Sequence, residues 1–185
     1  MEQVTSNSFR RRAIVICLNL SLGLGFPSFC QAAGEPTEYQ VKAAFLLNFT
    51  KFIEWPAAAF ETPAAPIAIC ILGDDPFGSA LDQFVAGEVV NGRKVTVERI
   101  KHAPPPKACQ VLFTARSEKD AARSLLGLGM GTLTVGESEA FVRDGGMIAF
   151  VVEDRRVRFE INQTAAQSAG LKLSSRLLNV AKSVE

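Results

Sequence analysis

The chain has 185 residues, of which 48% are hydrophobic and 21% are charged, and its formal net charge is +1 at pH 7. Because there is no basic surplus, the composition excludes binding to nucleic acids or anionic lipids that depends mainly on phosphate contacts. The length fits one domain with a sizeable hydrophobic core.

The N-terminus predicts a secretory signal peptide. A basic cluster, Arg10–Arg12, precedes an apolar run over residues 13–29. The small residues Cys30 and Ala32 then follow two positions apart, which is the spacing that a signal peptidase requires. We therefore predict cleavage after Ala32, with residues 1–32 as the signal peptide.

Two alternatives to cleavage stay open. The first is an uncleaved membrane anchor, although the strongly apolar stretch is shorter than the roughly 18 residues that a span needs. The second is a lipid on Cys30, although Phe29 is larger than the residue that lipoprotein signals prefer at that position. After cleavage, residues 33–185 form a single domain. Losing three arginines and one glutamate changes its net charge from +1 to −1.

Cys70 and Cys109 are the cysteines that remain after this cleavage. An even number of cysteines in an oxidising compartment predicts one disulfide. It would close a loop of about 40 residues and stabilise the fold by about 4 kcal/mol in the chain-entropy description. The alternative is two free, buried thiols. The single histidine, His102, adds no metal-ligand spacing to these cysteines, so we predict no metal site.

Residues 37–55 are predicted to form a helix that is apolar on two sides. Thr37 and Gln40 fit a capping box, and Pro56 ends the helix because its ring disfavours the helical conformation of Trp55. Two apolar stripes follow the helical period. The stripes are Tyr39, Ala43, Leu46 and Ile53, and Val41, Phe45, Phe49 and Phe52. The outer stripe would either pack in the core or serve as a dimer surface.

The rest of the chain alternates strands with helices. Apolar runs and period-two alternation predict strands over residues 67–72, 95–100, 109–114, 132–135, 147–153 and 157–161. Capping residues and turn signals predict helices over residues 76–86, 117–128, 137–142 and 163–169, and a last helix capped by Ser174 or Ser175. This order predicts an α/β fold, a three-layer αβα sandwich with a mostly parallel sheet and a late antiparallel hairpin.

The sequence offers no recognisable catalytic set. There is no G-x-S-x-G or H-E-x-x-H motif, and one histidine leaves no obvious triad. The glycine-rich segment 127–131 follows a predicted helix, so it does not fit a dinucleotide-binding loop. Asp74 and Asp75 follow a strand end, where such folds place active sites, but a solvated turn is the preferred interpretation. We therefore predict no enzymatic activity and no cofactor.

Charged side chains cluster around the predicted late hairpin. They are Arg155, Arg156 and Arg158 together with Glu153, Asp154 and Glu160. One interpretation is a solvated edge hairpin whose charges prevent edge-to-edge pairing. The other interpretation, of equal weight, is a surface on which a partner docks.

Four stretches in a fixed order make the sequence similar to a known family. They are residues 41–49 (VKAAFLLNF) with 52–56 (FIEWP), residues 69–78 (ICILGDDPFG), Cys109 with its apolar strand, and the late segments 145–150 (GGMIAF), 158–162 (RFEIN) and 170–178 (GLKLSSRLL). In this combination the chain resembles the YfiR-like family, small periplasmic proteins of Gram-negative bacteria. The ordered set spans nearly all of the chain after the signal peptide.

The resemblance implies a function in signalling. The protein that gives the family its name is a periplasmic repressor of a membrane-bound diguanylate cyclase. By binding the periplasmic domain of the cyclase it lowers cyclic di-GMP, and with it biofilm formation. An OmpA-like outer-membrane lipoprotein captures the repressor and lifts the repression. The resemblance therefore implies a periplasmic location, these two kinds of partner and a homodimer.

The resemblance also implies structural features and site residues. It implies an αβα arrangement and a disulfide between Cys70 and Cys109. Some members carry a second cysteine pair near the late hairpin, and this sequence lacks it. Partner binding is implied for the late strand and the following helix, at Phe150, Glu160, Ile161 and Asn162.

An alternative function is a periplasmic module that binds a small ligand and acts on another membrane sensor. The predicted fold offers a cleft at the strand ends, and the aromatic residues near Trp55 could form an apolar pocket. The other interpretation of these aromatic rings is packing in the core.

Overall fold

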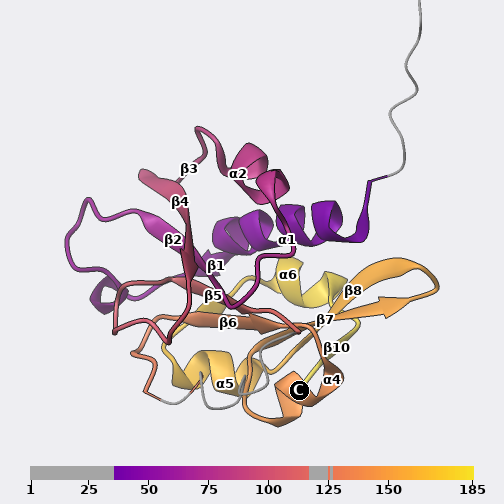
Figure 1. The fold of residues 1–185 in the computed structure, drawn as a ribbon. Coiled ribbons are helices and arrows are strands. Elements are labelled where there is room, and N and C mark those ends of the chain that lie inside the picture. Colours follow the sequence, from indigo (N-terminus) through magenta and orange to yellow (C-terminus); the bar gives the residue numbers. More distant parts are fainter. Residues whose placement is uncertain (1–35, 117–124, 126) are drawn as a thin grey trace, which may run out of the picture. The chain divides into compact units, whose positions relative to one another are not determined.

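The computed structural model describes residues 36–116, 125 and 127–185. The predicted signal peptide and most of the predicted helix 117–128 lie outside the described residues. Within the described part, the order of strands and helices follows the predicted alternation (Figure 1).

The first element, α1, spans Glu38–Phe52 and begins at the predicted capping box. The Gln40 N–H donates to the Thr37 hydroxyl at 3.3 Å, and the Thr37 N–H donates to Gln40 Oε1 at 2.7 Å. These two bonds satisfy backbone and side-chain groups that would otherwise lack partners at the start of a helix. The start of the helix was therefore predictable from two residues.

The end of α1 differs from the prediction, which placed it at Trp55. The helix stops at Phe52, and Ile53–Glu54 form the short strand β1. This strand pairs antiparallel with β9, Lys172–Leu173. Pro56 disfavours the helical conformation only at Trp55, so the earlier end at Phe52 is explained by the pairing of Ile53–Glu54 with β9, which satisfies their backbone groups. A short 3₁₀ helix, η1 (Ala57–Ala59), follows.

The described residues form an eight-stranded sheet with the order β10-β8-β7-β6-β5-β2-β4-β3. Neighbours from β4 to β7 run parallel, whereas the pairs β3–β4 and β7–β8 are antiparallel. The strands are β2 (Ile67–Leu72), β3 (Val89–Val90), β4 (Arg93–Ile100), β5 (Val111–Thr114), β6 (Leu133–Gly136), β7 (Ile148–Glu153), β8 (Arg156–Ile161) and β10 (Ser183–Val184). This topology confirms the predicted α/β fold with a mostly parallel sheet and a late antiparallel hairpin.

Helices cover both faces of the sheet. Phe150 in β7 packs in the large core cluster beneath α1, whereas the preceding residue, Ala149, packs with Phe141 of α4. Successive strand residues point to opposite faces, so α1 and α4 lie on opposite sides of the sheet, as Figure 1 shows. The helix α4 spans Glu139–Arg143. The other helices among the described residues are α2 (Ser79–Val85), α5 (Gln163–Ser168) and α6 (Ser175–Val180).

Cys70 and Cys109 form a disulfide, with their Cα atoms 5.8 Å apart. Cys70 lies in β2 and Cys109 shortly before β5, so the bond joins two neighbouring strands. Both side chains are buried in a separate apolar cluster that includes Leu112. The next residue, Phe113, belongs to the core beneath α1, so the disulfide lies on the sheet face that α1 does not cover.

Candidate partner-docking site

The β7–β8 hairpin extends beyond the neighbouring strands. Its two strands pair along their whole length, from Ile148 opposite Ile161 to Glu153 opposite Arg156. In contrast, β6 pairs only with the start of β7, and β10 pairs only with the end of β8. The outer part of the hairpin therefore projects as a two-stranded ribbon, seen at the right of Figure 1.

The hairpin closes through the predicted two-residue turn. Asp154 and Arg155 both have positive φ, 49° and 61°. This is the turn geometry whose twist matches that of the two flanking strands. Arginine has a Cβ atom that disfavours this conformation, so the turn carries a local steric cost at Arg155.

Arg155→Gly is expected to raise the free energy of unfolding by about 0.5–1 kcal/mol, because glycine adopts positive φ without steric cost. Chemical denaturation would measure the change. Arg156→Gly is the matched control, since Arg156 lies within β8, where glycine weakens a strand. If the two glycine variants lost stability equally, the turn would not be strained.

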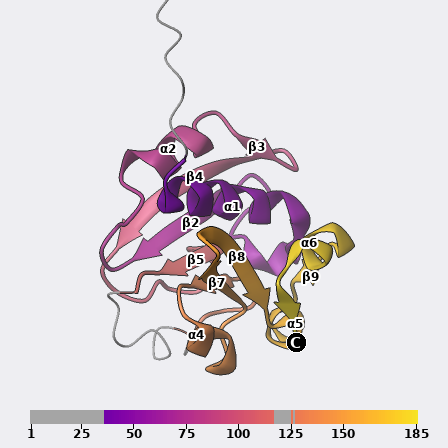
Figure 2. The same ribbon diagram turned by 90° about the vertical axis from the view of Figure 1, so that its right-hand side faces the viewer.

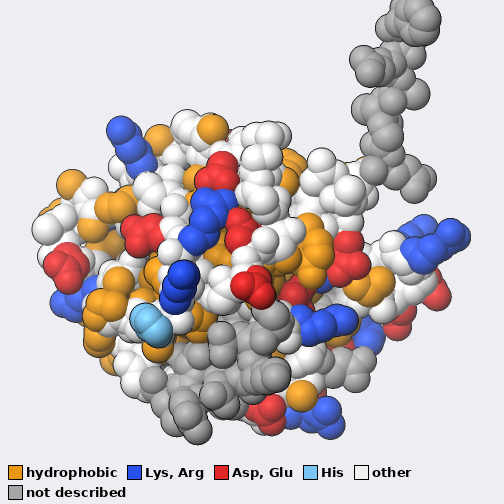
Figure 3. Space-filling model, viewed as in Figure 1, with side chains coloured by type: hydrophobic (Ala, Val, Ile, Leu, Met, Phe, Trp, Pro, Cys, Tyr) orange, Lys and Arg blue, Asp and Glu red, His pale blue; other side chains and the backbone are white. Residues whose placement is uncertain are grey.

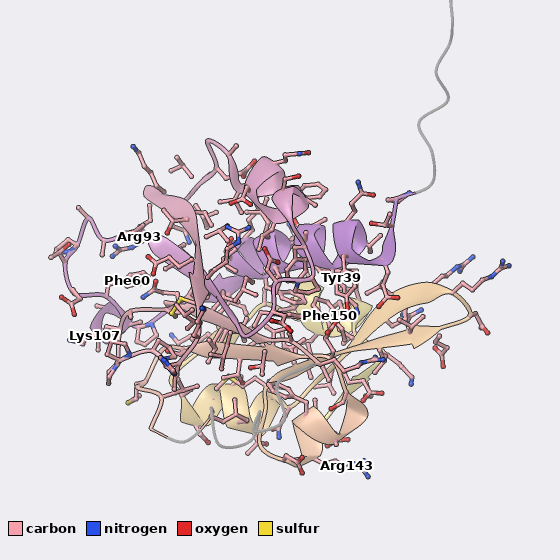
Figure 4. All side chains as sticks on the ribbon, in the orientation of Figure 1. Tyr39, Phe60, Arg93, Lys107, Arg143 and Phe150 are labelled. Atoms are coloured by element: carbon pink, nitrogen blue, oxygen red, sulfur yellow. A yellow bond between two sulfur atoms is a disulfide. The ribbon has the colours of Figure 1, made fainter. Side chains whose placement is uncertain are left out.

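Two of the four predicted partner-binding residues lie in the core. Phe150 is 2% exposed and Ile161 is fully buried. The Phe150 ring packs against Phe45 and Phe49 of α1, with centroids 6.1 Å and 5.8 Å away, and Figure 4 shows it between α1 and the sheet. In this conformation, Phe150 and Ile161 support the surface from below.

The other two predicted residues, Glu160 and Asn162, are half-buried. Glu160 forms an ion pair with Lys182, with its Oε1 3.2 Å from the Lys182 Nζ. Both residues line a hollow of about 260 Å³, together with Val142, Arg143 and Glu185. Asn162 caps α5, with its Oδ1 accepting from the Ala165 N–H at 2.8 Å. The structure therefore assigns the Asn162 side-chain oxygen to the start of a helix.

A groove of about 600 Å³ lies between the start of α1 and the hairpin. Its apolar floor comprises Val41 and Phe45 of α1 with Val152 and Val157 of the hairpin. Val152 is 51% exposed, which is high for a valine in a strand. The rim carries charge, and the lining is completed by Pro36, Glu38, Arg155 and Arg156.

A second hollow of about 240 Å³ lies between α1 and α6, and Phe45 lines both. Figure 2, viewed from the side of the hairpin, shows α1 and α6 beside β8. The lining of this hollow is almost entirely apolar apart from the polar parts of Asn48 and Arg176, and its other members are Phe49, Phe52, Phe159, Leu177 and Val180. We call the groove and this hollow together the docking face.

A cluster of aromatic rings supports the docking face. Phe45 lies 5.3 Å from Phe159 and 6.1 Å from Phe49 between ring centroids. Phe49 in turn lies 5.2 Å from Phe159. Edge-to-face and offset ring pairs at these distances are favourable beyond their buried area, so the floor of the face is firmly packed. A firmly packed apolar surface suits binding of a folded partner, because little side-chain entropy is lost on contact.

The charges around the docking face are mainly basic on the hairpin side. Arg155, Arg156 and Arg158 lie near the tip and outnumber Glu153 and Asp154. Figure 3 shows basic side chains gathered at this projecting tip. The face is therefore suited to a partner that presents apolar side chains flanked by carboxylates.

One charged pair behind the docking face was not predicted from the sequence. Lys42 of α1 is buried, and its Nζ donates to Glu137 Oε1 at 2.6 Å and also to Glu38. Burial pushes the pKa of Lys42 down, but the hydrogen bonds and negative charges of Glu137 and Glu38 outweigh it, so the pKa is raised. One signal could have marked Lys42: it shares a helix face with the buried residues Leu46 and Phe49.

A comparison with protein families shows to which family the chain belongs. A model of the YfiR/HmsC-like family matches residues 39–182. The chain belongs to the YfiR/HmsC-like family. This match covers the disulfide, the hairpin and all of the docking face except Pro36 and Glu38, and it agrees with the resemblance noted from the sequence. No curated protein matches the chain.

Two solved structures resemble parts of the chain. A conserved domain protein from Vibrio cholerae O1 biovar El Tor strain N16961 superposes with a TM-score of 0.53 at 10% sequence identity, over 80% of this chain and 60% of that one. The ABC domain in complex with L-Trp from Streptococcus pneumonia has a TM-score of 0.43 at 13% identity, over 64% of this chain and 55% of its own. The chain thus spans little more than half the length of either. The likeness to the Vibrio cholerae protein concerns the fold alone.

Two further properties concern the part of the chain that the structure describes. None of the helices there combines the length and apolarity that crossing a membrane requires. Those residues also contain no group of three or more His, Cys, Asp or Glu side chains placed to hold a metal ion.

Proposed function

We propose that this protein is a periplasmic, non-enzymatic signalling regulator. Its docking face would bind the periplasmic domain of a membrane-bound diguanylate cyclase, or a related sensor, and inhibit it. Inhibition would lower cyclic di-GMP and thereby restrain biofilm formation. A homodimer and release by an OmpA-like outer-membrane lipoprotein belong to the same proposal, through the resemblance to the YfiR-like family.

The observation that carries the proposal is the docking face. It joins a groove of about 600 Å³ to a second apolar hollow, and its lining includes the exposed side chains of Val152 and Val180. Contiguous apolar surface with a charged rim is typical of protein interaction sites. The family match over residues 39–182 supports a regulatory role. The buried disulfide suits an oxidising compartment such as the periplasm.

Inhibition requires that the regulator binds one state of the sensor more tightly than another. Deleting the gene is therefore expected to raise cellular cyclic di-GMP, and a secreted copy is expected to reverse the rise. A copy without its first 32 residues, kept in the cytoplasm, should fail to reverse it. An unchanged cyclic di-GMP level in the deletion strain would contradict the proposal.

Val152→Asp places a carboxylate in the apolar floor of the groove and is expected to weaken partner binding about 10- to 100-fold. The secreted variant should then fail to restore repression. Val89→Asp is the matched control, because Val89 is a valine that is 58% exposed in β3, at the opposite edge of the sheet. Equal loss of repression in both folded variants would remove the docking face from the proposal.

A second function, a small-ligand module, is favoured by one observation. The hollow between α1 and α6 is lined by four phenylalanines, namely Phe45, Phe49, Phe52 and Phe159. Its volume of about 240 Å³ suits one small aromatic molecule. A titration with aromatic metabolites, followed by Trp55 fluorescence, distinguishes this function, because a docking face for protein alone gives no response.

A further inference from the structure

A separate hollow lies at the carboxyl ends of three parallel strands. It is lined by residues that directly follow β2, β5 and β6, together with Tyr39 of α1: Asp74, Asp75, Pro76, Ala115, Arg116 and Glu137. Its volume is about 200 Å³, which corresponds to about six or seven water molecules at about 30 Å³ each. It therefore has room for a small metabolite.

This hollow lies where the strand order of the sheet reverses direction. From β2 the chain proceeds to β4 on one side, and it then crosses to β5 on the other side of β2. In open α/β sheets, the crevice at such a reversal of strand order, outside the carboxyl ends of the strands, is the usual place for a ligand. We call this hollow the switch-point pocket.

The wall of the switch-point pocket contains buried charge. The side chains of Lys42 and Glu137 are 2% and 1% exposed. Glu137 Oε1 accepts from Lys42 Nζ, and Oε2 accepts from the Arg116 N–H at 3.2 Å. Burial and the adjacent negative charge of Glu137 raise the pKa of Tyr39. Because an apolar pair of similar volume would often be at least as stable, a buried ion pair beside a cavity indicates a functional constraint.

Asp74 and Arg116 are the charged side chains of the pocket that can face a ligand. The neighbouring Asp75 is already engaged, since its Oδ1 accepts from the Phe77 N–H at 2.7 Å and its Oδ2 from Arg99 Nε at 2.8 Å. Asp74 is exposed and pairs with no other residue in the described ranges. The Arg116 guanidinium is exposed as well, with one long contact of 3.4 Å to the Glu137 carbonyl oxygen.

These groups define the chemistry of a ligand. A carboxylate at Asp74 suits a cationic nitrogen, and a guanidinium at Arg116 suits a carboxylate in a two-pronged contact. Tyr39 of α1 also lines the pocket, and Figure 4 shows it directed toward the sheet. We infer that the switch-point pocket binds a small zwitterion that carries an ammonium group and a carboxylate.

Isothermal titration calorimetry on the purified protein tests this inference. The probes are the twenty L-amino acids and glycine betaine, each titrated singly, with butylamine and butyrate as comparators that carry one charge each. At least one zwitterion is expected to bind with a Kd of about 1 mM or below, and both comparators are expected not to bind. Absence of binding by every zwitterion, or equal binding by butylamine or butyrate, would overturn the inference.

Variants locate the binding. Asp74→Asn and Arg116→Gln are each expected to weaken binding at least about tenfold, because each removes one charge that faces the ligand. Both side chains are exposed, so folding should be preserved. Asp144→Asn, a matched change at an exposed aspartate beside α4, should keep the affinity. Unchanged affinity in both pocket variants would place the ligand elsewhere.

The inference is independent of the proposed function. No cyclase or other partner is present in the titration, so a failure of repression in cells leaves the binding result intact. Val152→Asp should bind the zwitterion like the unchanged protein, because Val152 lines the groove and not the switch-point pocket.

Discussion

Cys70→Ser is expected to lower the free energy of unfolding by about 2–4 kcal/mol, because the bond with Cys109 restricts the unfolded chain over a long loop. For a domain of this size, the melting temperature should fall by about 5–15 °C. Differential scanning calorimetry of the secreted protein would measure the change. Dithiothreitol should lower the melting temperature of the unchanged protein and leave that of the variant as it is.

Thiol counting provides the decisive control for the disulfide. In denaturant without reductant, the secreted protein should show no free thiol, and Cys70→Ser should show one, from Cys109. Two free thiols in the unchanged protein would contradict the bond. Because both cysteines are buried, reduction should also need local opening of the fold, so it should speed up in dilute denaturant.

Much of the fold could be predicted because its signals are local. The capping box of Thr37 and Gln40 fixes the start of α1, and the pair Asp154–Arg155 closes the late hairpin. The unbroken apolar run of β2 predicts a strand covered on both faces, and every residue of β2 is buried. In each case the physical cause lies within a few residues of the effect.

Other features depend on contacts between distant segments. The early end of α1 results from pairing of Ile53–Glu54 with β9, more than a hundred residues later in the chain. The two-residue strand β10 forms only because β8 offers it an edge. Neither segment has a periodicity of its own that would predict a strand.

The candidate site was predicted in part. The outer stripe of α1, including Val41 and Phe45, was recognisable as surplus apolar surface. Its neighbours Val152 and Val157 were not, because the hairpin reaches α1 only in three dimensions. The family resemblance implies partner binding at Phe150, which is 2% exposed and lies beneath the surface of the docking face, and its role in partner binding stays a prediction.

The second large effect is expected at the buried ion pair. Lys42→Met should lower the free energy of unfolding by about 3–5 kcal/mol, because it leaves Glu137 buried without its cationic partner. Lys51→Met is the matched control on the same helix. Its pair with Glu88 is solvent-exposed, so the loss there should stay below about 1 kcal/mol. Urea denaturation would measure both variants.

A double variant separates the charge from the packing. When Lys42→Met is combined with Glu137→Leu, no buried charge is left unpaired, so much of the lost stability should return. If the double variant were as unstable as the sum of the two single variants, the pair would act through packing alone.

The ion pair also predicts how stability depends on pH. Because the pKa of Lys42 is raised in the folded state, the stabilisation contributed by Lys42 is complete below its unfolded pKa of about 10.5. The unchanged protein should therefore lose the stabilisation contributed by Lys42 only above about pH 10.5.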